Sequence, residues 1–216
     1  MISIKTFVFN PLQENTIVLY DETNECIIID PGCYEPYEKE ELVSFIKLNE
    51  LIPKMILNTH CHIDHVVGNQ FVKEYFDIKL FVPEKEAPLI KAATTYAPMY
   101  GFHRFEESFP DGFIQENELI SFGNSTLSVL QVPGHSPAHV AFYNAEQGFC
   151  INGDVLFKGS YGRTDLPGGN FQTLVNSITN VMFQLPDETI IYCGHGPTTT
   201  IGFEKIHNPM AGKYLK

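Results

Sequence analysis

Short apolar runs bounded by glycine, proline or asparagine alternate along the chain with longer segments of helical periodicity. The predicted strands span residues 2–9, 15–20, 26–30, 54–58, 79–82 and 189–193, with four more between residues 119 and 152. The predicted helices span residues 38–49, 66–76, 84–93, 171–184 and 201–207. Strands and helices come in two similar halves. We therefore expect an α/β (α+β) fold, a four-layer αββα sandwich in which two mixed sheets face each other with helices outside.

Residues 60–65, His-Cys-His-Ile-Asp-His, place three imidazoles and a carboxylate within six positions. The histidines do not share one face of a straight helix or strand, so their convergence requires a tight loop at the end of an element. The alternative is that these are surface or core histidines that bind no metal. The density of the cluster disfavours it, because buried neutral imidazoles need a cation to accept their lone pairs. Imidazole together with carboxylate suits zinc or iron better than magnesium or calcium.

Three more predicted strands end just before a candidate metal ligand, namely His135, Asp154 and His195. Each of these residues follows a glycine or lies in a turn, where the backbone can approach a bound ion closely. We therefore expect the ligand loops to meet at one edge of the fold.

The order His-x-His-x-Asp-His, followed by His, Asp and His at successive intervals of 75, 19 and 41 residues, the first counted from His60, resembles the metallo-β-lactamase superfamily. The motifs span residues 60–195. The resemblance implies two bound divalent transition-metal ions, with zinc favoured and iron or manganese as alternatives. It assigns His60, His62 and His135 to one ion, Asp64, His65 and His195 to the other, and Asp154 to a bridging position.

This ligand set leaves one net positive charge, because Asp64, Asp154 and a bridging hydroxide remove three of the four charges that two divalent ions bring. Such a centre can hold an oxyanion. Metal binding lowers the pKa of bound water from ~15.7 toward ~7, so the expected nucleophile is a metal-bound hydroxide, and no catalytic side chain is expected beyond it. His139 is expected to be a supporting residue, since seven ligands already fill a two-metal site.

The composition, 44% hydrophobic without a linker, repeat or low-complexity tract, predicts one domain over residues 1–216. The amino terminus lacks a signal-peptide pattern, and no apolar run reaches the ~20 residues of a membrane helix. Five cysteines without C-x-x-C spacing indicate free thiols in a reducing compartment, so we expect a cytoplasmic protein. The acidic runs 38–41 and 84–86 are expected on solvated helix faces.

The net charge of −12, with only two arginines, argues against a polyanionic partner. We expect a small-molecule substrate and neither nucleic acid nor a membrane as partner. The aromatic stretch from Tyr96 to Phe113 suits a core or a dimer contact more than a substrate lip, which leaves a homo-oligomer open.

Two segments that extend beyond the ligands themselves resemble compact glyoxalase II-like proteins, which are hydroxyacylglutathione hydrolases without the long helical domain of the larger enzymes. The segments are residues 156–169 and residues 194–209. The resemblance implies hydrolysis of an acyl thioester, S-lactoylglutathione or a related compound.

Lys158, Tyr161 and Arg163 are the candidate substrate residues, because two cations in so acidic a chain could clamp a carboxylate of an anionic substrate. The alternatives are that Arg163 pairs with Asp165 to fix the loop, that Lys158 is solvated and that Tyr161 covers the loop.

Thioesters are favoured over amides, because a thiolate, whose conjugate acid has a pKa of ~8.5, leaves without a proton donor and an amine does not. The main alternative function is that of a persulfide dioxygenase, which the segment 162–165 also resembles and which would use His60, His135 and Asp154 around one iron. A metal-stabilised binding module without catalysis ranks third, since structural zinc sites are usually closed and rich in cysteine.

Overall fold

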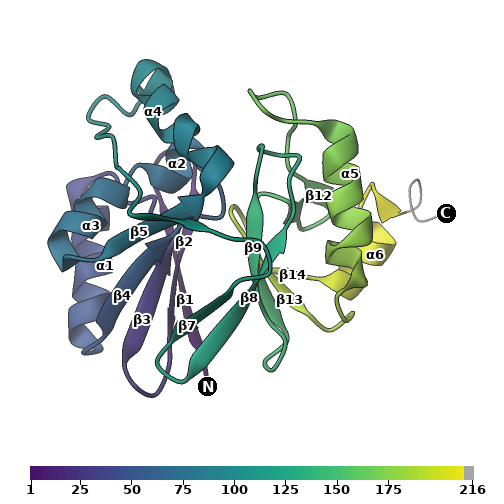
Figure 1. Ribbon diagram of the computed structural model, residues 1–216, viewed down its shortest axis with the longest axis horizontal. Coiled ribbons are helices and arrows are strands. Elements are labelled where there is room, and N and C mark those ends of the chain that lie inside the picture. Colours follow the sequence, from purple (N-terminus) through teal and green to yellow (C-terminus); the bar gives the residue numbers. More distant parts are fainter. Residues whose placement is uncertain (212–216) are drawn as a thin grey trace. The chain divides into compact units, whose positions relative to one another are not determined.

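The computed structural model describes residues 1–211 and divides into two compact units (Figure 1). Of the described residues, the first unit contains 1–114 and 121–126, and the second contains 115–120 and 127–211. Each unit is built on one mixed six-stranded sheet.

The sheet of the first unit has its strands in sequence order: β1 (Ser3–Phe9), β2 (Glu14–Tyr20), β3 (Glu25–Ile29), β4 (Ile52–Leu57), β5 (Lys79–Pro83) and β6 (Gly112–Ile114). The first three strands pair antiparallel and the later ones parallel. The helical segments of this unit are α1 (Pro36–Leu48), α2 (Ile63–Val66), α3 (Asn69–Phe76), α4 (Ala87–Tyr96) and the 3-10 turns η1 (Glu84–Glu86) and η2 (Ala97–Tyr100).

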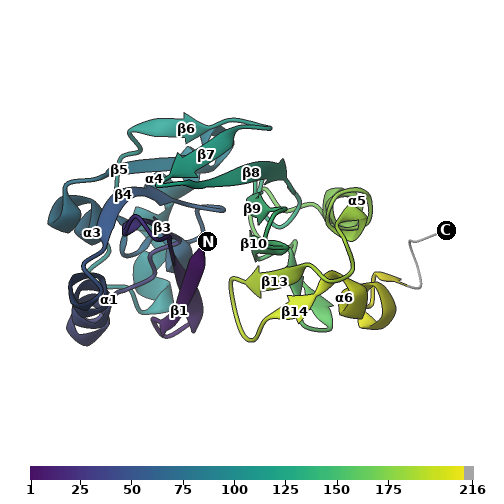
Figure 2. The ribbon, with the colours of Figure 1, turned by 90° about the horizontal axis from the view of Figure 1, so that it is seen from below.

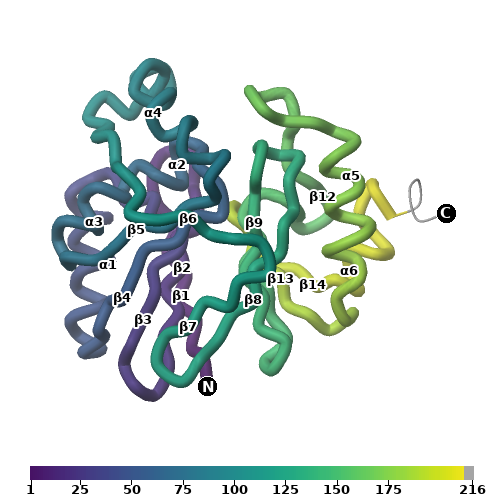
Figure 3. Tube along the Cα trace, in the orientation of Figure 1, coloured from purple at the N-terminus to yellow at the C-terminus, as the bar shows by residue number. Residues whose placement is uncertain are grey.

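The core of the first unit lies between one face of its sheet and the helices α1 and α3, which run side by side in Figure 3. Val18, Ile28, Ile56 and Leu80 form one row across four adjacent strands, because each is paired with the next in register. All four side chains are buried in one cluster with apolar residues of α1 and α3, which explains why these apolar runs become the centre of the sheet.

The sheet of the second unit has the order β14-β13-β10-β9-β8-β7. Its strands are β7 (Leu119–Phe122), β8 (Ser125–Gln131), β9 (Val140–Asn144), β10 (Phe149–Gly153), β13 (Ile190–Cys193) and β14 (Thr199–Thr200), although residues 121–126 group with the first unit. A small hairpin of β11 (Leu156–Phe157) and β12 (Ser160–Tyr161) follows β10. The helices α5 (Phe171–Asn180) and α6 (Ile201–His207), with the 3-10 turn η3 (Met182–Gln184), pack beside this sheet (Figure 2).

Two mixed sheets with helices confirm the predicted fold class, and the long predicted elements are present within a few residues of their expected bounds. The predicted helix 66–76 was wrong in one respect, because it is divided into α2 and α3. Gly68 donates its N–H to the Pro31 carbonyl (2.8 Å), and a Cβ at Gly68 would lie 2.5 Å from that oxygen. The close backbone approach interrupts the helix. That residues 1–216 form a single domain stays a prediction.

The prediction that both acidic runs lie on solvated faces was wrong for Glu38 and Glu86, which are buried. Glu38 accepts hydrogen bonds from the N–H groups of Asn10 (2.7 Å), Tyr34 (2.8 Å) and Glu35 (2.8 Å). Glu86 accepts one from the N–H of Cys61 (3.1 Å). Backbone donors thus compensate the burial of both carboxylates.

All five cysteines are free thiols, as predicted, and all are buried. Among residues 1–211, no helix combines the length and the apolar character that crossing a membrane requires.

Candidate metal centre

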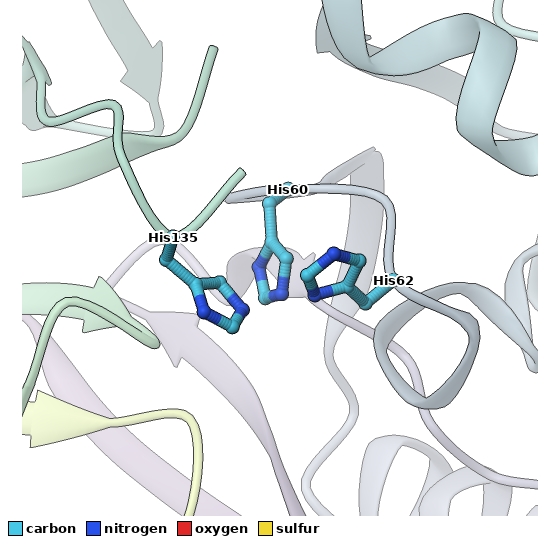
Figure 4. A group of neighbouring side chains, drawn as sticks. All are labelled: His60, His62 and His135. Carbon is cyan, nitrogen blue, oxygen red and sulfur yellow. The ribbon is translucent and has the colours of Figure 1, made fainter. Parts of the chain in front are cut away.

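The loop that follows β4 and the short helix α2 carry four of the predicted ligands, all within the first unit. His60, Asp64 and His65 are buried and His62 is partly exposed. The ring centroid of His60 lies 4.8 Å from that of His62 and 4.2 Å from that of His65. Figure 4 shows the imidazoles of His60 and His62 next to each other on this loop. The third labelled ring in the figure, His135, belongs to the second unit and is described with its own neighbours below.

Hydrogen bonds at Nδ1 determine the tautomers of His60 and His65. Nδ1 of His65 lies 3.1 Å from Oδ2 of Asp30, so the ring donates its Nδ1–H to this carboxylate. The Thr59 hydroxyl donates to the same carboxylate (2.6 Å) and therefore accepts from Nδ1–H of His60 (3.0 Å). In both rings Nε2 carries the lone pair, which is the form that binds a metal ion.

Asp64 and His65 place an oxygen and a nitrogen at the separation expected for two ligands of one ion. Oδ2 of Asp64 lies 3.7 Å from Nε2 of His65, which is too long for a hydrogen bond. Two ligand atoms at ~2.1 Å from a tetrahedral ion are roughly 3.4 Å apart. The main chain at Asp64 is held by Asn10, whose Nδ2 donates to the Asp64 carbonyl (3.0 Å).

The second unit brings together His135, Asp154 and His195, each from the end of a different strand. Oδ2 of Asp154 lies 3.6 Å from Nε2 of His135 and also 3.6 Å from Nε2 of His195. Both separations match those of two ligands on one ion. One carboxylate oxygen therefore lies at ligand distance from both histidines, the arrangement that a bridging aspartate requires.

Two hydrogen bonds and one tightly packed glycine support this second group. Nδ1 of His135 donates to the Arg163 carbonyl (2.8 Å), which leaves the lone pair on Nε2. The N–H of Asp154 donates to Nε2 of His139 (3.1 Å), so His139 supports the aspartate from behind. Gly162 is tightly enclosed, because a Cβ there would lie 2.0 Å from the Asp154 carbonyl oxygen and 3.0 Å from Nδ1 of His135.

Asp30 and Glu14 are the residues of this centre that sequence reasoning missed. Asp30, directly after β3, accepts from the N–H of Thr59 (2.7 Å) in addition to its contacts with the Thr59 hydroxyl and His65. Asp30, His60 and His65 each have one potential metal-ligand atom within 4.8 Å of the other two. The carboxylate oxygens of Asp30 already accept hydrogen bonds, however, so Asp30 orients the histidines instead of binding an ion. Glu14 Oε1 lies 3.9 Å from Nδ1 of His65, and burial raises the pKa of Glu14 well above its usual range. The sequence Asp30-Pro31-Gly32 at the end of an apolar strand was the available signal.

A model of the family described as "Metallo-beta-lactamase superfamily" matches residues 9–195. The chain belongs to the metallo-beta-lactamase superfamily. It is 35% identical over 209 residues to hydroxyacylglutathione hydrolase GloC of Haemophilus influenzae, a match that covers 96% of this chain and 97% of the relative.

Two solved structures extend this result. A crystal structure of BLEG-1 B3 metallo-beta-lactamase is similar to this chain with a TM-score of 0.88 and 36% identity, over 97% of this chain and all of the other. A structure of TTHA1623 in a di-iron-bound form has a TM-score of 0.85 and 37% identity, over 95% and 98%. The chain thus combines the superfamily's fold with a cluster of histidines and aspartates suited to divalent metal ions, and its relatives support a metal-dependent enzyme.

The three candidate substrate residues of this superfamily member lie on or directly after the β11–β12 hairpin. Nζ of Lys158 lies over the Phe203 ring, 5.7 Å from its centroid, and the half-buried Tyr161 lies 6.1 Å from the Phe171 ring. The exposed Arg163 guanidinium donates to both oxygens of Asp165 (2.7 Å each) and lowers the Asp165 pKa to about 2. The ion pair foreseen as the loop-fixing alternative is therefore present.

Proposed function

We propose that this protein is a metal-dependent hydrolase that cleaves an acyl thioester, S-lactoylglutathione or a related compound. The observation that carries the proposal is the position of Asp154 Oδ2, 3.6 Å from Nε2 of both His135 and His195, because it suits a centre of two ions. The similarity to GloC, a relative named as a hydroxyacylglutathione hydrolase, supports the thioester class.

The residues fit such a centre, because each of His60, His65 and His135 presents Nε2 as an acceptor and each aspartate presents Oδ2 to a histidine nitrogen. His60, His62 and His135 would hold one ion, Asp64, His65 and His195 the other, and Asp154 both. When bound, the ions would lower the pKa of water to ~7 and polarise the substrate carbonyl. Zinc is the proposed metal, with iron and manganese as alternatives. The di-iron form of the similar protein TTHA1623 supports iron as one of these alternatives.

The chemistry of the leaving group favours a thioester over an amide. A thiol has a pKa of ~8.5, so a thiolate departs at neutral pH without a proton from the protein, whereas an amine must be protonated as it leaves. A β-lactam is the amide to compare, because the similar protein BLEG-1 is named a B3 metallo-beta-lactamase. We propose that thioesters exceed matched amides in kcat/KM by orders of magnitude.

The net negative charge of the chain limits the class of substrate that it can bind. With a net charge of −12 the protein repels polyanions in general, so a small molecule is the proposed partner and nucleic acid is not. Lys158, four residues after Asp154, supplies local positive charge, and Arg163, nine residues after it, would do so on exchanging Asp165 for a substrate carboxylate, which supports an anionic thioester. We propose a cytoplasmic location on the basis of the five free thiols.

A persulfide dioxygenase is the second candidate, favoured by the sequence Gly162-Arg163-Thr164-Asp165. It would need one iron, held by His60, His135 and Asp154. A single iron held by those three residues would leave Asp64, His65 and His195 without a role as ligands, and their separations from neighbouring ligand atoms favour a second ion and therefore the hydrolase.

The deciding experiment combines elemental analysis of freshly purified protein with two assays on the same sample. We expect two transition-metal ions per chain, release of thiol and acid in equal amounts from S-lactoylglutathione, and no oxygen uptake with glutathione persulfide. One iron per chain, with oxygen uptake and no thioester cleavage, would establish the dioxygenase instead. Asp154→Ala is the matched inactive control, because it removes the oxygen shared by His135 and His195.

A further inference from the structure

The β11–β12 hairpin connects the metal centre of the second unit to the carbonyl that orients one of its ligands. It begins directly after Asp154 and Val155, and the N–H of Gly162 returns to the Val155 carbonyl (3.2 Å). The next carbonyl, that of Arg163, accepts the Nδ1–H of His135 (2.8 Å). The position of the hairpin therefore determines where this acceptor lies.

The hairpin has little intrinsic stability. Each of its strands has two residues, and only two residue pairs join them, Leu156 with Tyr161 and Phe157 with Ser160. Isolated hairpins, even longer ones, are marginal in water, so an external contact must hold this one in place.

Asn152 binds both main-chain groups of Leu156 at the base of the hairpin (2.7 and 3.1 Å). Helix α6 and the residue that caps its C-terminus supply the contacts at the turn, from two side chains. Glu204 accepts the N–H of Gly159 with both carboxylate oxygens (3.0 and 3.1 Å). Asn208 donates from Nδ2 to the Ser160 carbonyl (2.8 Å) and to Oε2 of Glu204 (2.7 Å). The donor and the acceptor at the hairpin turn are therefore both bound to one connected pair of side chains.

The buried position of this pair argues for a specific role. Glu204 is fully buried and Asn208 is 3% exposed. A third donor, the Thr199 hydroxyl, lies 2.6 Å from Oε1 of Glu204. A buried carboxylate is costly unless hydrogen bonds compensate it, and an apolar residue would fill the same space against the sheet. What the carboxylate adds over an apolar residue is the fixed hydrogen bond to the hairpin turn.

We propose that Glu204 and Asn208 are positioning residues of the metal centre, which hold the β11–β12 hairpin and through it keep His135 in the tautomer with its lone pair on Nε2. The inference rests on the proposed function in one point, the role of His135 as a metal ligand. The chain of contacts runs from α6 to Gly159 and Ser160, along the hairpin to the Arg163 carbonyl, and from there to the imidazole.

The test compares Glu204→Ala and Asn208→Ala with Thr200→Ala in the full-length protein. Thr200 caps α6, since its hydroxyl accepts the N–H of Phe203 (3.2 Å), so its removal weakens the same helix without touching the hairpin. Glu204→Gln is the conservative variant, because its side-chain carbonyl can still accept the N–H of Gly159.

Two measurements report on the proposal independently. The tautomer of His135 is read in metal-free protein from the nitrogen chemical shifts of ¹⁵N-labelled histidine, with His135→Ala identifying the signal. Zinc affinity is read by competition with a chromophoric chelator. We expect Glu204→Ala and Asn208→Ala to populate both tautomers of His135 and to weaken zinc binding about tenfold, the lower end of the range for supporting residues, while Thr200→Ala and Glu204→Gln keep the single tautomer.

An unchanged His135 signal in both alanine variants that still fold would overturn the proposal, as would an equal change in Thr200→Ala, because the effect would then come from helix stability alone. If the wild-type protein bound no transition metal, the proposed function would fail, and the tautomer comparison would still decide whether α6 positions His135.

Discussion

The Nδ1–H of His65 donates to Oδ2 of Asp30 across 3.1 Å, and this bond joins a residue at the end of β3 to one in α2. The same oxygen accepts the Thr59 hydroxyl, which in turn orients His60. One carboxylate thus determines the tautomer of two proposed ligands. It does so from a left-handed backbone position, with φ at 49°.

We expect Asp30→Asn to lower the affinity for zinc by about 10- to 100-fold without unfolding the protein. Asparagine keeps the size of the side chain and tolerates the left-handed conformation, but it removes the charge that makes His65 a stronger ligand. Isothermal titration of metal-free protein with zinc measures the change.

Asp77→Asn is the matched control, because Asp77 is exposed, has nearly the same φ of 51°, and loses the same charge on substitution. An equal loss of zinc affinity in both variants would show that overall charge, rather than the contact with His65, governs metal binding.

Gly162→Ala should reduce metal binding at least tenfold. The new Cβ would lie 2.0 Å from the Asp154 carbonyl oxygen and 3.0 Å from Nδ1 of His135, so the backbone that carries one ligand and the ring of another must both move. Metal content after dialysis against a weak chelator is the measurement.

The control for strain alone is Gly148→Ala. Gly148 has a φ of 65°, but a Cβ there meets nothing within 4 Å, so its replacement costs about 1 kcal/mol of backbone strain without a clash. We expect this variant to keep its full metal content. Retention of both ions in Gly162→Ala would refute the steric argument.

The sequence could identify the candidate ligands that the structure brings together within each unit, because each candidate follows a strong apolar strand and stands beside a turn residue, which local patterns reveal. The sequence did not predict the role of Asp30, because Asp-Pro-Gly is also an ordinary turn sequence and the partner of Asp30, His65, lies 35 residues away. Glu86 appeared solvated for a similar reason, since the N–H of Cys61 that it binds is 25 residues distant. Long-range partners of buried carboxylates leave no local periodicity.

The short strands were missed for a different physical reason. The strands β11, β12 and β14 have two residues each, too few to show alternation, and tertiary contacts such as those of Glu204 hold them. The division of the predicted helix 66–76 likewise depends on a contact with Pro31 that the helical pattern does not contain.

Acid stability should depend on Asp21. Burial opposes ionisation of this carboxyl, but hydrogen bonds from Thr23, Ser125 and Asn124 outweigh it and lower the pKa of Asp21 to about 2. Because the folded-state pKa lies below the unfolded value of ~3.9, the stabilisation is present above pH ~4 and is lost as the pH falls toward 2. It amounts to about 1 to 2 kcal/mol.

Titration of the Asp21 carboxyl by ¹³C NMR measures this pKa directly, and urea unfolding from pH 5 to 2 measures its effect on stability. Asp21→Asn should flatten the loss of stability over that pH range, whereas Asp77→Asn should not. A native carboxyl that titrates near 3.8 would contradict the prediction.

The main chain and the side chain of Arg163 have different contacts, so a substitution can test the side chain alone. Its carbonyl orients His135, and its guanidinium binds Asp165. Truncation removes only the guanidinium, so we expect Arg163→Ala to keep its metal content. If the guanidinium also binds the carboxylate of the substrate, KM for S-lactoylglutathione should rise roughly two- to fivefold with little change in kcat, as expected for one exposed ion pair.

Asp165→Asn provides the opposite test, because it releases the guanidinium from its competitor. Under the same proposal KM for S-lactoylglutathione falls in this variant, while KM for a neutral thioester is unchanged in both variants. A guanidinium that serves only to fix the loop gives a different pattern: the two substitutions then alter KM in the same direction and equally for charged and neutral thioesters, because both break one ion pair. Steady-state kinetics with the two substrates therefore assign Arg163 either to substrate binding or to loop structure.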